Sequence, residues 1–407
     1  MVLTPALVVP DDRSWTAWGV DLHELGYAGA STVATTELLL APAHVPEELT
    51  PALRAAWELM PASRRHRVLG DPLPHGTPLA AVLEAASHHA PSDHDQAHGD
   101  HGDHGEHGDH EDMMAITGEP SADGLVMEDL EVTLGPLAPQ LPGGLVAELA
   151  LDGDVVASCA LRRTLHAHGL LPDPTTPVAW RAALARRRTD VRGVELERVR
   201  SHASWFGALG RLLGWFELCD VARTIVCAVR APDERELERA RTPAARLGQL
   251  VDSRRFSWRA RGRAQLARER AEELGLTGPS ARASGLARDA RTGDPAYVGL
   301  GFMPVLESGG DVLARAHVRA REIVMSLGLA EAAPEVGARE APRATAVEGP
   351  RGPLRADPAP LGQPPRFHAP GTDAALRAAG EAAVGLEWSA AMLALASFDL
   401  SGWAVAG

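Results

Sequence analysis

The sequence predicts an α+β fold in which a helical bundle carries most of the core and a small β segment precedes it. Apolar positions at steps of three and four residues predict one long helix with a buried face, made of Val199, His202, Phe206, Leu209, Leu213 and Phe216. A second long helix is predicted from Asp311, a good N-cap after Gly309-Gly310, to about Leu329. The segments GLVAELAL and VVASCAL flank DGD and predict a β-hairpin, with Asp152-Gly153 favouring the tight turn.

Length and charge bound the class of protein. The 407 residues are enough for one large domain or two to three smaller ones. All 40 basic residues are arginine and the formal net charge is −14, so the chain lacks the basic footprint of a nucleic-acid-binding protein. No stretch of about 18 uncharged apolar residues is present, as a membrane-spanning helix would need. The first residues lack the charged start and apolar run of a signal peptide, so we expect none.

Cysteine usage points to a reducing compartment. Cys159, Cys219 and Cys227 form no CxxC pair, which argues against zinc ribbons and thiolate-held clusters. A cytoplasmic protein is therefore expected.

The chain divides into three predicted segments. Residues 1–90 are expected to form a small N-terminal domain, α/β or α+β, of unknown role. Its helix, PEELTPALRAAWELM, has Thr50 as the predicted N-cap and Pro51 as the first helical residue. Residues 91–112 form a linker. Residues 113–407 form the main domain, with a β segment at 125–165, a helical bundle at 175–330, and a C-terminal β turn and one or two apolar helices at 340–407.

The linker has a composition of its own, PSDHDQAHGDHGDHGEHGDHED. Residues 93–112 hold eight acidic residues and no arginine. Recurrent glycine and high charge predict disorder. Imidazoles interleaved with carboxylates suit zinc or nickel; they belong to His94, His98, His101, His104, His107 and His110. Two interpretations stay open: a solvated spacer and a metal-binding segment.

Several motifs follow one another in the main domain. They are GPLAPQLPGGLVAELALDGDVV, ELERVRSHASWFGALG, GPSARASGLARDAR, DPAYVGLGFMPVLESGGDVLARAHVRAREI, VEGPRGPL and SFD. In this order and spacing they resemble one family, which unites the large subunit of nickel–iron hydrogenases with its counterpart in proton-pumping NADH-quinone oxidoreductase. The resemblance runs from about Glu128 to the C-terminus. It implies the helical bundle of that family with a small β appendage.

The resemblance also implies a setting and partners. Proteins of this family dock against a small iron–sulfur subunit that carries a [4Fe-4S] cluster, and they join membrane subunits in a respiratory oxidoreductase complex. The expected location is cytoplasmic, peripheral on the inner face of the cell membrane, with membrane association through partners. Quinone and NAD binding are implied for the complex. The chain has no glycine-rich dinucleotide motif, so NAD is expected to bind elsewhere in it.

Two departures from the family pattern limit the chemistry. A nickel–iron centre needs two CxxC pairs, which this chain lacks, so no cofactor is expected to be ligated by this chain. In quinone-reducing relatives, two histidines of GPQHPxxHG lie near the quinone. The aligned stretch here carries Leu137, Ala138 and Pro142 where polar residues are expected, and the usual tyrosine partner is not visible.

His202 matches the family histidine that points towards the partner's terminal iron–sulfur cluster. Such a contact would tune the cluster potential through hydrogen bonding. Because His202 lies on the apolar stripe, a core histidine with satisfied hydrogen bonds is the alternative.

Charged residues of the same motifs predict a buried network. Its proposed members are Arg198, Arg282, Asp289, Arg291, Asp311, Arg315, Arg319, Glu322, Glu348 and Arg351, and Asp399 matches the closing acid of the family. The alternative is surface ion pairing, worth only about 0–1 kcal/mol per pair, whereas breaking a buried network costs roughly 3–5 kcal/mol. For Glu348 and Arg351, a tight turn with its charges facing water is the competing interpretation.

Three functions are therefore open. The first is a component of a membrane-associated redox complex, of the NADH-quinone oxidoreductase or energy-converting hydrogenase type, that helps form a cavity for quinone or another acceptor. The second is a scaffold subunit with the same fold that has lost its active site. The third is a metal-handling protein that acts through the linker.

Overall fold

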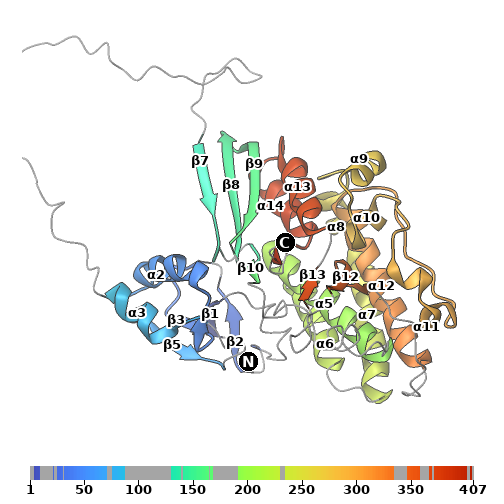
Figure 1. Ribbon diagram of the computed structural model, residues 1–407, viewed down its shortest axis with the longest axis horizontal. Coiled ribbons are helices and arrows are strands. Elements are labelled where there is room, and N and C mark those ends of the chain that lie inside the picture. The colour runs from blue at the N-terminus through green and yellow to red at the C-terminus, as the bar shows by residue number, and fades with distance from the viewer. Residues whose placement is uncertain are drawn as a thin grey trace, which may run out of the picture.

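The computed structural model describes most of the chain outside the linker and several loops. The described residues are 4–9, 22, 25–30, 32–70, 76–87, 130–138, 141–164, 166–167, 191–229, 234–333, 346–357, 366–368, 371–400 and 404–405. The predicted class is confirmed, because the fold is α+β with helices dominating (Figure 1). The predicted linker, residues 91–112 with its six histidines, lies outside the described residues.

The N-terminal region forms a small α/β unit. Its sheet has the order β2-β1-β3-β5, with every pair parallel. The strands are β1 Thr4–Val8, β2 Tyr27–Gly29, β3 Leu38–Ala41 and β5 Arg65–Val68. Helices α2 (Thr50–Leu59) and α3 (Leu79–Ser87) pack on one face through a shared apolar core. A short pair, β4 His44–Val45 with β6 Thr77–Pro78, completes the unit.

The start of α2 differs from the prediction by one position. A 3-10 turn, η1 Glu47–Leu49, leads directly into the helix, so Leu49 is the N-cap and Thr50 the first helical residue. The Thr50 hydroxyl donates back to the carbonyl of Pro46 at 3.4 Å and caps no amide. The prediction was wrong because the preceding turn already satisfies the helix start.

The predicted hairpin is confirmed and belongs to a three-stranded antiparallel sheet, β7-β8-β9. The strands are β7 Leu130–Leu134, β8 Leu145–Asp152 and β9 Val155–Arg163. Asp152 pairs with Val155, so the two turn residues are Gly153 and Asp154 instead of Asp152-Gly153. Gly153 has φ +62 and occupies the first turn position, where a two-residue loop favours glycine.

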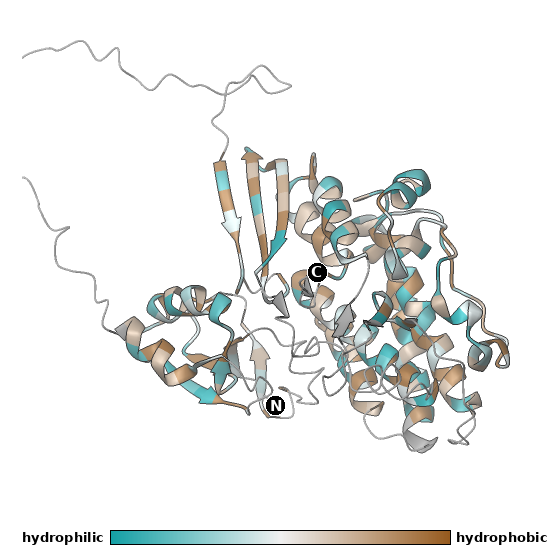
Figure 2. Cartoon of the chain, viewed as in Figure 1, coloured by the Kyte–Doolittle hydropathy of each residue, from teal (hydrophilic) through white to brown (hydrophobic). Residues whose placement is uncertain are grey.

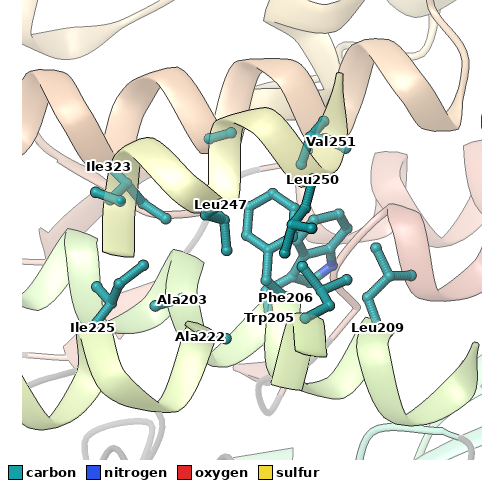
Figure 3. Close-up of a cluster of buried hydrophobic side chains, with 14 of the residues drawn as sticks. Ala203, Trp205, Phe206, Leu209, Ala222, Ile225, Leu247, Leu250, Val251 and Ile323 are labelled. Atoms are coloured by element: carbon teal, nitrogen blue, oxygen red, sulfur yellow. The ribbon is translucent and has the colours of Figure 1, made fainter. Parts of the chain in front are cut away.

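The helical bundle holds the largest apolar core. It consists of α5 Val191–Leu212, α6 Phe216–Ala228, α7 Glu234–Val251 and α12 Val312–Ala332. Trp205 and Phe206 of α5, Leu247 of α7 and Ile323 of α12 all belong to this core (Figure 3). Hydrophilic and hydrophobic residues both occur along each long helix (Figure 2), as expected when one face of the helix is buried.

Helix α5 ends earlier than the apolar stripe suggests. Gly214 has φ +60, and the amides of Gly214 and Trp215 donate to the carbonyls of Arg211 and Gly210 at 3.1 and 2.8 Å. This is a Schellman C-cap, which ends the helix at a left-handed glycine. Phe216 therefore begins α6 and is 81% exposed, so its assignment to the stripe was wrong. The second long helix is confirmed: the Asp311 carboxylate accepts from the amide of Ala314.

Short helices and turns connect α7 to α12. They are α8 Arg254–Ala260, α9 Arg268–Glu273, α10 Gly278–Ala283, η2 Ala290–Gly293 and α11 Pro295–Val298. Helix α10 and the η2 turn come from the GPSARASGLARDAR stretch. They carry three of its charged side chains towards α12.

The C-terminal part supplies a sheet and two helices. The predicted hairpin of VEGPRGPL is confirmed as β11 Ala346–Gly349 with β12 Gly352–Asp357, and β13 Arg366–His368 extends it. The apolar tail forms α13 Thr372–Ala383 and α14 Trp388–Ser397. Helix α13 packs on β9 beside the bundle (Figure 1), and β14 Ala404–Val405 pairs with β10 His166–Ala167. Within the described residues, no helix has the length and apolar character needed to cross a bilayer.

Candidate functional site

Charged side chains gather inside the bundle where α5, α10, η2, α12, β11 and the end of α14 meet. We call this group the charge cluster, and the side chain of each member is buried. Its members are Glu195, Arg198, His202, Arg282, Asp289, Arg291, Arg319, Glu322, Glu348 and Asp399. Ions at this depth are tolerated only when they are paired and hydrogen-bonded, so the contacts decide what the cluster can do.

Glu322 of α12 lies at the centre. Its Oε1 accepts from Arg282 Nη2 at 2.8 Å and from Arg291 Nη2 at 2.7 Å, and its Oε2 lies 2.9 Å from His202 Nε2. Burial alone would raise the pKa of Glu322, but Arg282 and the His202 hydrogen bond hold that pKa well below its usual range. Glu322 is therefore ionised, and it joins three segments that are distant in the sequence.

Glu195 of α5 forms the second anionic position. Its carboxylate accepts from Arg198 at 3.1 Å, from Arg291 Nη1 at 3.3 Å and from the Tyr297 hydroxyl at 2.7 Å. Ser326 of α12 donates to the same carboxylate at 2.5 Å. Burial opposes ionisation, yet Arg198 and Arg291 lower the pKa of Glu195. Burial and the Glu195 charge raise the pKa of Tyr297 well above its usual range, so the phenol stays protonated and donates.

Arg282 of α10 brings two further carboxylates together. Its Nη1 lies 3.0 Å from Asp289 Oδ2 and 3.0 Å from Glu348 Oε1. Asp289 is also paired with Arg291, whereas Glu348 accepts a hydrogen bond from the backbone amide of Ala290 at 3.0 Å. Burial raises the pKa of Glu348, and the neighbouring Asp289 charge adds to that rise. Glu348 is thus the carboxylate of this pair that holds a proton more readily.

His202 links Glu322 to the pair of Arg319 and Asp399. Arg319 Nη1 lies 3.1 Å from His202 Nδ1 and 3.1 Å from Asp399 Oδ2. A guanidinium has no acceptor atom, so Nδ1 accepts and the proton lies on Nε2, which donates to Glu322. Burial lowers the pKa of His202 to about 4, so the ring is neutral at pH 7. The whole side chain is enclosed by this chain.

Arg315 and Asp311 hold loops rather than join the cluster. Arg315 donates to Ser397 Oγ at 2.9 Å and to the carbonyls of Gly310 and Ala264 at 2.8 and 3.0 Å. Asp311 accepts from the amides of Ala314 and Gly262 at 2.8 and 2.7 Å. Burial lowers the pKa of Arg315 to about 9, and this guanidinium remains charged at pH 7.

Helical spacing explains how local sequence builds half of the cluster. Residues 195, 198 and 202 lie at steps of three and four on one face of α5, and residues 315, 319, 322 and 326 do the same on α12. The other half depends on two turns whose backbones touch. A Cβ on Gly278, which has φ +63, would lie 2.2 Å from the Arg351 carbonyl oxygen, and one on Gly352 would lie 2.4 Å from Thr277 Oγ1. This contact brings Glu348 against Arg282.

The residues present do not suit a nickel–iron centre. Cys159 lies on β9, while Cys219 and Cys227 lie on α6 and are absent from the charge cluster. Burial raises the pKa of Cys159 to about 11, which keeps it a thiol. Three cysteines cannot supply four thiolates. Within the described part of the chain, no group of three or more His, Cys, Asp or Glu side chains is arranged to hold a metal ion.

In the stretch that aligns with the quinone-side histidines of the family, the described leucines pack in apolar cores. Leu137 is buried in the core of the N-terminal unit, and Leu141 is buried with β8 and α13. These side chains offer no proton donor or acceptor. The described contacts thus do not fit quinone chemistry by the family's histidine route.

Three residues of the site were not among the sequence candidates: Glu195, Tyr297 and Ser326. Glu195 opens the ELERVRSH motif one turn before Arg198, and Ser326 lies one turn after Glu322, so helical spacing alone was a usable signal. Tyr297 had no such signal, because it reaches Glu195 from the short helix α11, 102 residues away in the sequence. Of the candidates, Arg351 is only half-buried, and its carbonyl oxygen lies against Gly278.

Fold and site together give a helical bundle with a charge cluster at its centre and, with only three cysteines, no four-thiolate site. Residues 236–348 match the family of the respiratory-chain NADH dehydrogenase, 49 Kd subunit. The expected resemblance is confirmed over that range, which runs from α7 to Glu348. The fold is similar to a chain of the membrane-bound sulfane sulfur reductase (MBS), an archaeal respiratory membrane complex. The TM-score is 0.52 and the identity 19%, covering 67% of this chain and 96% of that chain. No curated protein sequence matches the chain.

Proposed function

We propose that this chain is the hydrogenase-like large subunit of a membrane-associated respiratory redox complex, held on the cytoplasmic face of the membrane by its partners. The observation that carries the proposal is the family match over residues 236–348, which contains Arg282, Arg291, Glu322 and Glu348 of the charge cluster. The coverage of 96% of a chain from a respiratory membrane complex supports it.

In this proposal the chain docks against a small iron–sulfur subunit, whose [4Fe-4S] cluster supplies single electrons. The part played by this chain is electrostatic. His202 presents a neutral ring whose proton is fixed on Nε2 by Arg319, and Glu322 fixes its orientation. Because His202 is enclosed, it acts on the partner's cluster through the field of its hydrogen-bonded chain, without touching the cluster.

The central test is purification of the tagged full-length chain from its native membrane in mild detergent. The expected result is recovery with a small iron–sulfur subunit and membrane subunits, with an iron–sulfur EPR signal from the purified assembly. Recovery as a lone monomer from a membrane extract that contains those subunits would contradict the proposal.

A second test addresses His202 within that assembly. His202→Ala is expected to shift the midpoint potential of the partner's cluster in redox-poised EPR. Glu217→Gln, at an exposed position on α6, serves as the control and leaves the potential unchanged. An unshifted midpoint in the folded His202→Ala complex would leave His202 as a core histidine.

A scaffold subunit without an active site is the second candidate. It is favoured by the apolar packing of Leu137 and Leu141 and by the dense pairing inside the charge cluster. The two candidates separate in one assay, in which quinone reduction is measured in the purified complex with Glu348→Gln. A scaffold role predicts an intact assembly with unchanged turnover, and a redox role predicts an intact assembly with reduced turnover.

A metal-handling function through the linker rests on its composition alone. Calorimetric zinc and nickel titration of the full chain and of a variant lacking residues 93–112 tests it. Loss of metal binding with retained redox activity of the complex would make the linker auxiliary.

A further inference from the structure

Four arginines of the α8 segment, three exposed and one half-buried, lie in a stretch of the chain without acidic residues. The α8 segment SRRFSWRARGR, residues 253–263, has no acidic residue, although the chain carries a net charge of −14. Some exposed arginines elsewhere are paired with acidic residues, such as Arg246 with Glu217 and Arg288 with Glu272. Within the described chain, Arg254, Arg255, Arg259 and Arg261 form no ion pair.

Two exposed aromatic side chains come from α8 itself and from the start of α6, the segment that packs against it. Trp258 of α8 is 76% exposed, and Phe216 at the start of α6 is 81% exposed. Their neighbours Trp215 and Phe256 pack with ring centroids 6.3 Å apart, which holds the two segments together. The Arg255 guanidinium lies 4.8 Å from the centre of the Trp215 ring. We call Phe216, Arg254, Arg255, Trp258, Arg259 and Arg261 the arginine–aromatic patch.

We propose that the arginine–aromatic patch binds the surface of an anionic lipid bilayer directly. Tryptophan and phenylalanine can enter the boundary between headgroups and acyl chains, where amphipathic or aromatic side chains concentrate. Arginine pairs bidentately with phosphate, and its stem covers apolar surface while its head stays polar. The unpaired arginines complement an anionic surface that the rest of this acidic chain would repel.

A bilayer suits the patch better than a protein partner does. A stable protein interface buries roughly 800 Å² on each side around an apolar centre. Two large apolar side chains, one at the start of α6 and one on the short helix α8, supply less buried area than that. A headgroup layer needs no matching shape, so two protruding rings with flanking cations are sufficient. The inference goes beyond attachment through partner subunits, and it is independent of the redox role.

The test is co-sedimentation of the purified full chain with large vesicles. Vesicles of phosphatidylcholine with about 30% phosphatidylglycerol are compared with pure phosphatidylcholine, at salt from about 0.1 M to about 0.5 M. The patch variant is Arg254→Gln/Arg259→Gln/Arg261→Gln. The control variant, Arg54→Gln/Arg65→Gln/Arg239→Gln, removes the same charge from exposed positions elsewhere. Since each arginine near an anionic surface contributes about fivefold, the patch variant is expected to bind about a hundredfold more weakly.

The aromatic contribution is tested separately with Phe216→Ser/Trp258→Ser. This variant should fold, because both side chains are largely exposed, and it should lose vesicle binding at high salt. Circular dichroism and thermal melting confirm folding of each variant. Equal binding of the patch and control variants, or equal binding to neutral and anionic vesicles, would overturn the proposal. Normal vesicle binding by a patch variant that loses its partner subunits on purification would also overturn it, in favour of a protein interface.

Discussion

Helices α5 and α12 each bury two unlike faces, and the difference between the faces shows two ways of filling a protein interior. One face carries Trp205, Phe206 and Ile323 against α6 and α7, where packing is apolar (Figure 3). The other carries Glu195, His202 and Glu322, which meet arginines from α10 and η2. The two faces meet where the Arg319 guanidinium lies 4.7 Å from the centre of the Trp205 ring.

Equal burial therefore does not mean equal function. The apolar face stabilises by excluding water and tolerates a smaller side chain at the cost of a cavity. The charged face contributes little net stability, because desolvation offsets much of the attraction, but it ties segments between residues 195 and 399 into one arrangement. We infer that the apolar face determines how stable the bundle is, while the charged face determines where the loops lie.

The largest expected effect comes from removing the central anion. Glu322→Gln keeps the shape but leaves Arg282 and Arg291 with less compensation inside the bundle. Because an uncompensated buried charge is costly, the free energy of unfolding should fall by about 3–5 kcal/mol, measured by urea denaturation. A loss no greater than that of a surface pair would show that the cluster relaxes or admits water, and would remove the contrast between the faces.

The apolar face should respond somewhat less. Leu247→Ala deletes a fully buried side chain that packs among α5, α7 and α12. A cavity of this kind lowers the free energy of unfolding by about 2–4 kcal/mol. This loss should not depend on pH, because no ionisable group changes its partner, whereas the loss from Glu322→Gln should shrink as the pH falls below about 4.5, where the unfolded chain takes up the Glu322 proton first. A pH-dependent loss would mean that the two faces are coupled.

The pH dependence of stability sharpens the comparison further. The pKa of His202 is about 4 in the folded chain, below its value in the unfolded chain, so the unfolded state takes up a proton first as the pH falls. Stability should therefore fall by about 1.4 kcal/mol for each pH unit as the pH drops below about 6.5. His202→Asn, which keeps a polar side chain, should remove this slope between about pH 6.5 and 5. If the wild-type chain and His202→Asn lose stability with the same slope, a group other than His202 takes up the proton.

The smallest effect is expected at the surface. Arg246→Gln breaks an exposed pair with Glu217 that joins α7 to α6. Exposed pairs are screened by solvent, so the free energy of unfolding should change by less than about 1 kcal/mol, and the change should vanish at high salt. A larger loss of stability that persists at high salt would show that exposure to solvent does not determine how much an ion pair contributes.

Sequence patterns could predict those parts of the fold and site that depend on local spacing. The Asp311 cap, both strands of the 145–163 hairpin, and the shared face of Arg315, Arg319 and Glu322 follow from the short-range geometry of helices and turns. The end of α5 was missed because the apolar spacing continues past Gly214, and spacing alone does not show that this glycine adopts a left-handed conformation. Pairings such as Arg282 with Glu348, 66 residues apart, are tertiary and cannot be read from the spacing of a single sequence.

The back-to-back contact of Gly278 and Gly352 has a consequence for how this protein can vary. A methyl group on Gly278 would meet the main chain of Arg351 and Gly352, and one on Gly352 would meet the Thr277 side chain, so either would force the two segments apart. Gly352 begins β12, and the paired strand β11 bears Glu348, so its carboxylate would withdraw from Arg282 without any change to a charged residue. A substitution at either glycine would thus disturb the ionic interior through the backbone alone, which makes these two small residues a constraint on how that interior is assembled.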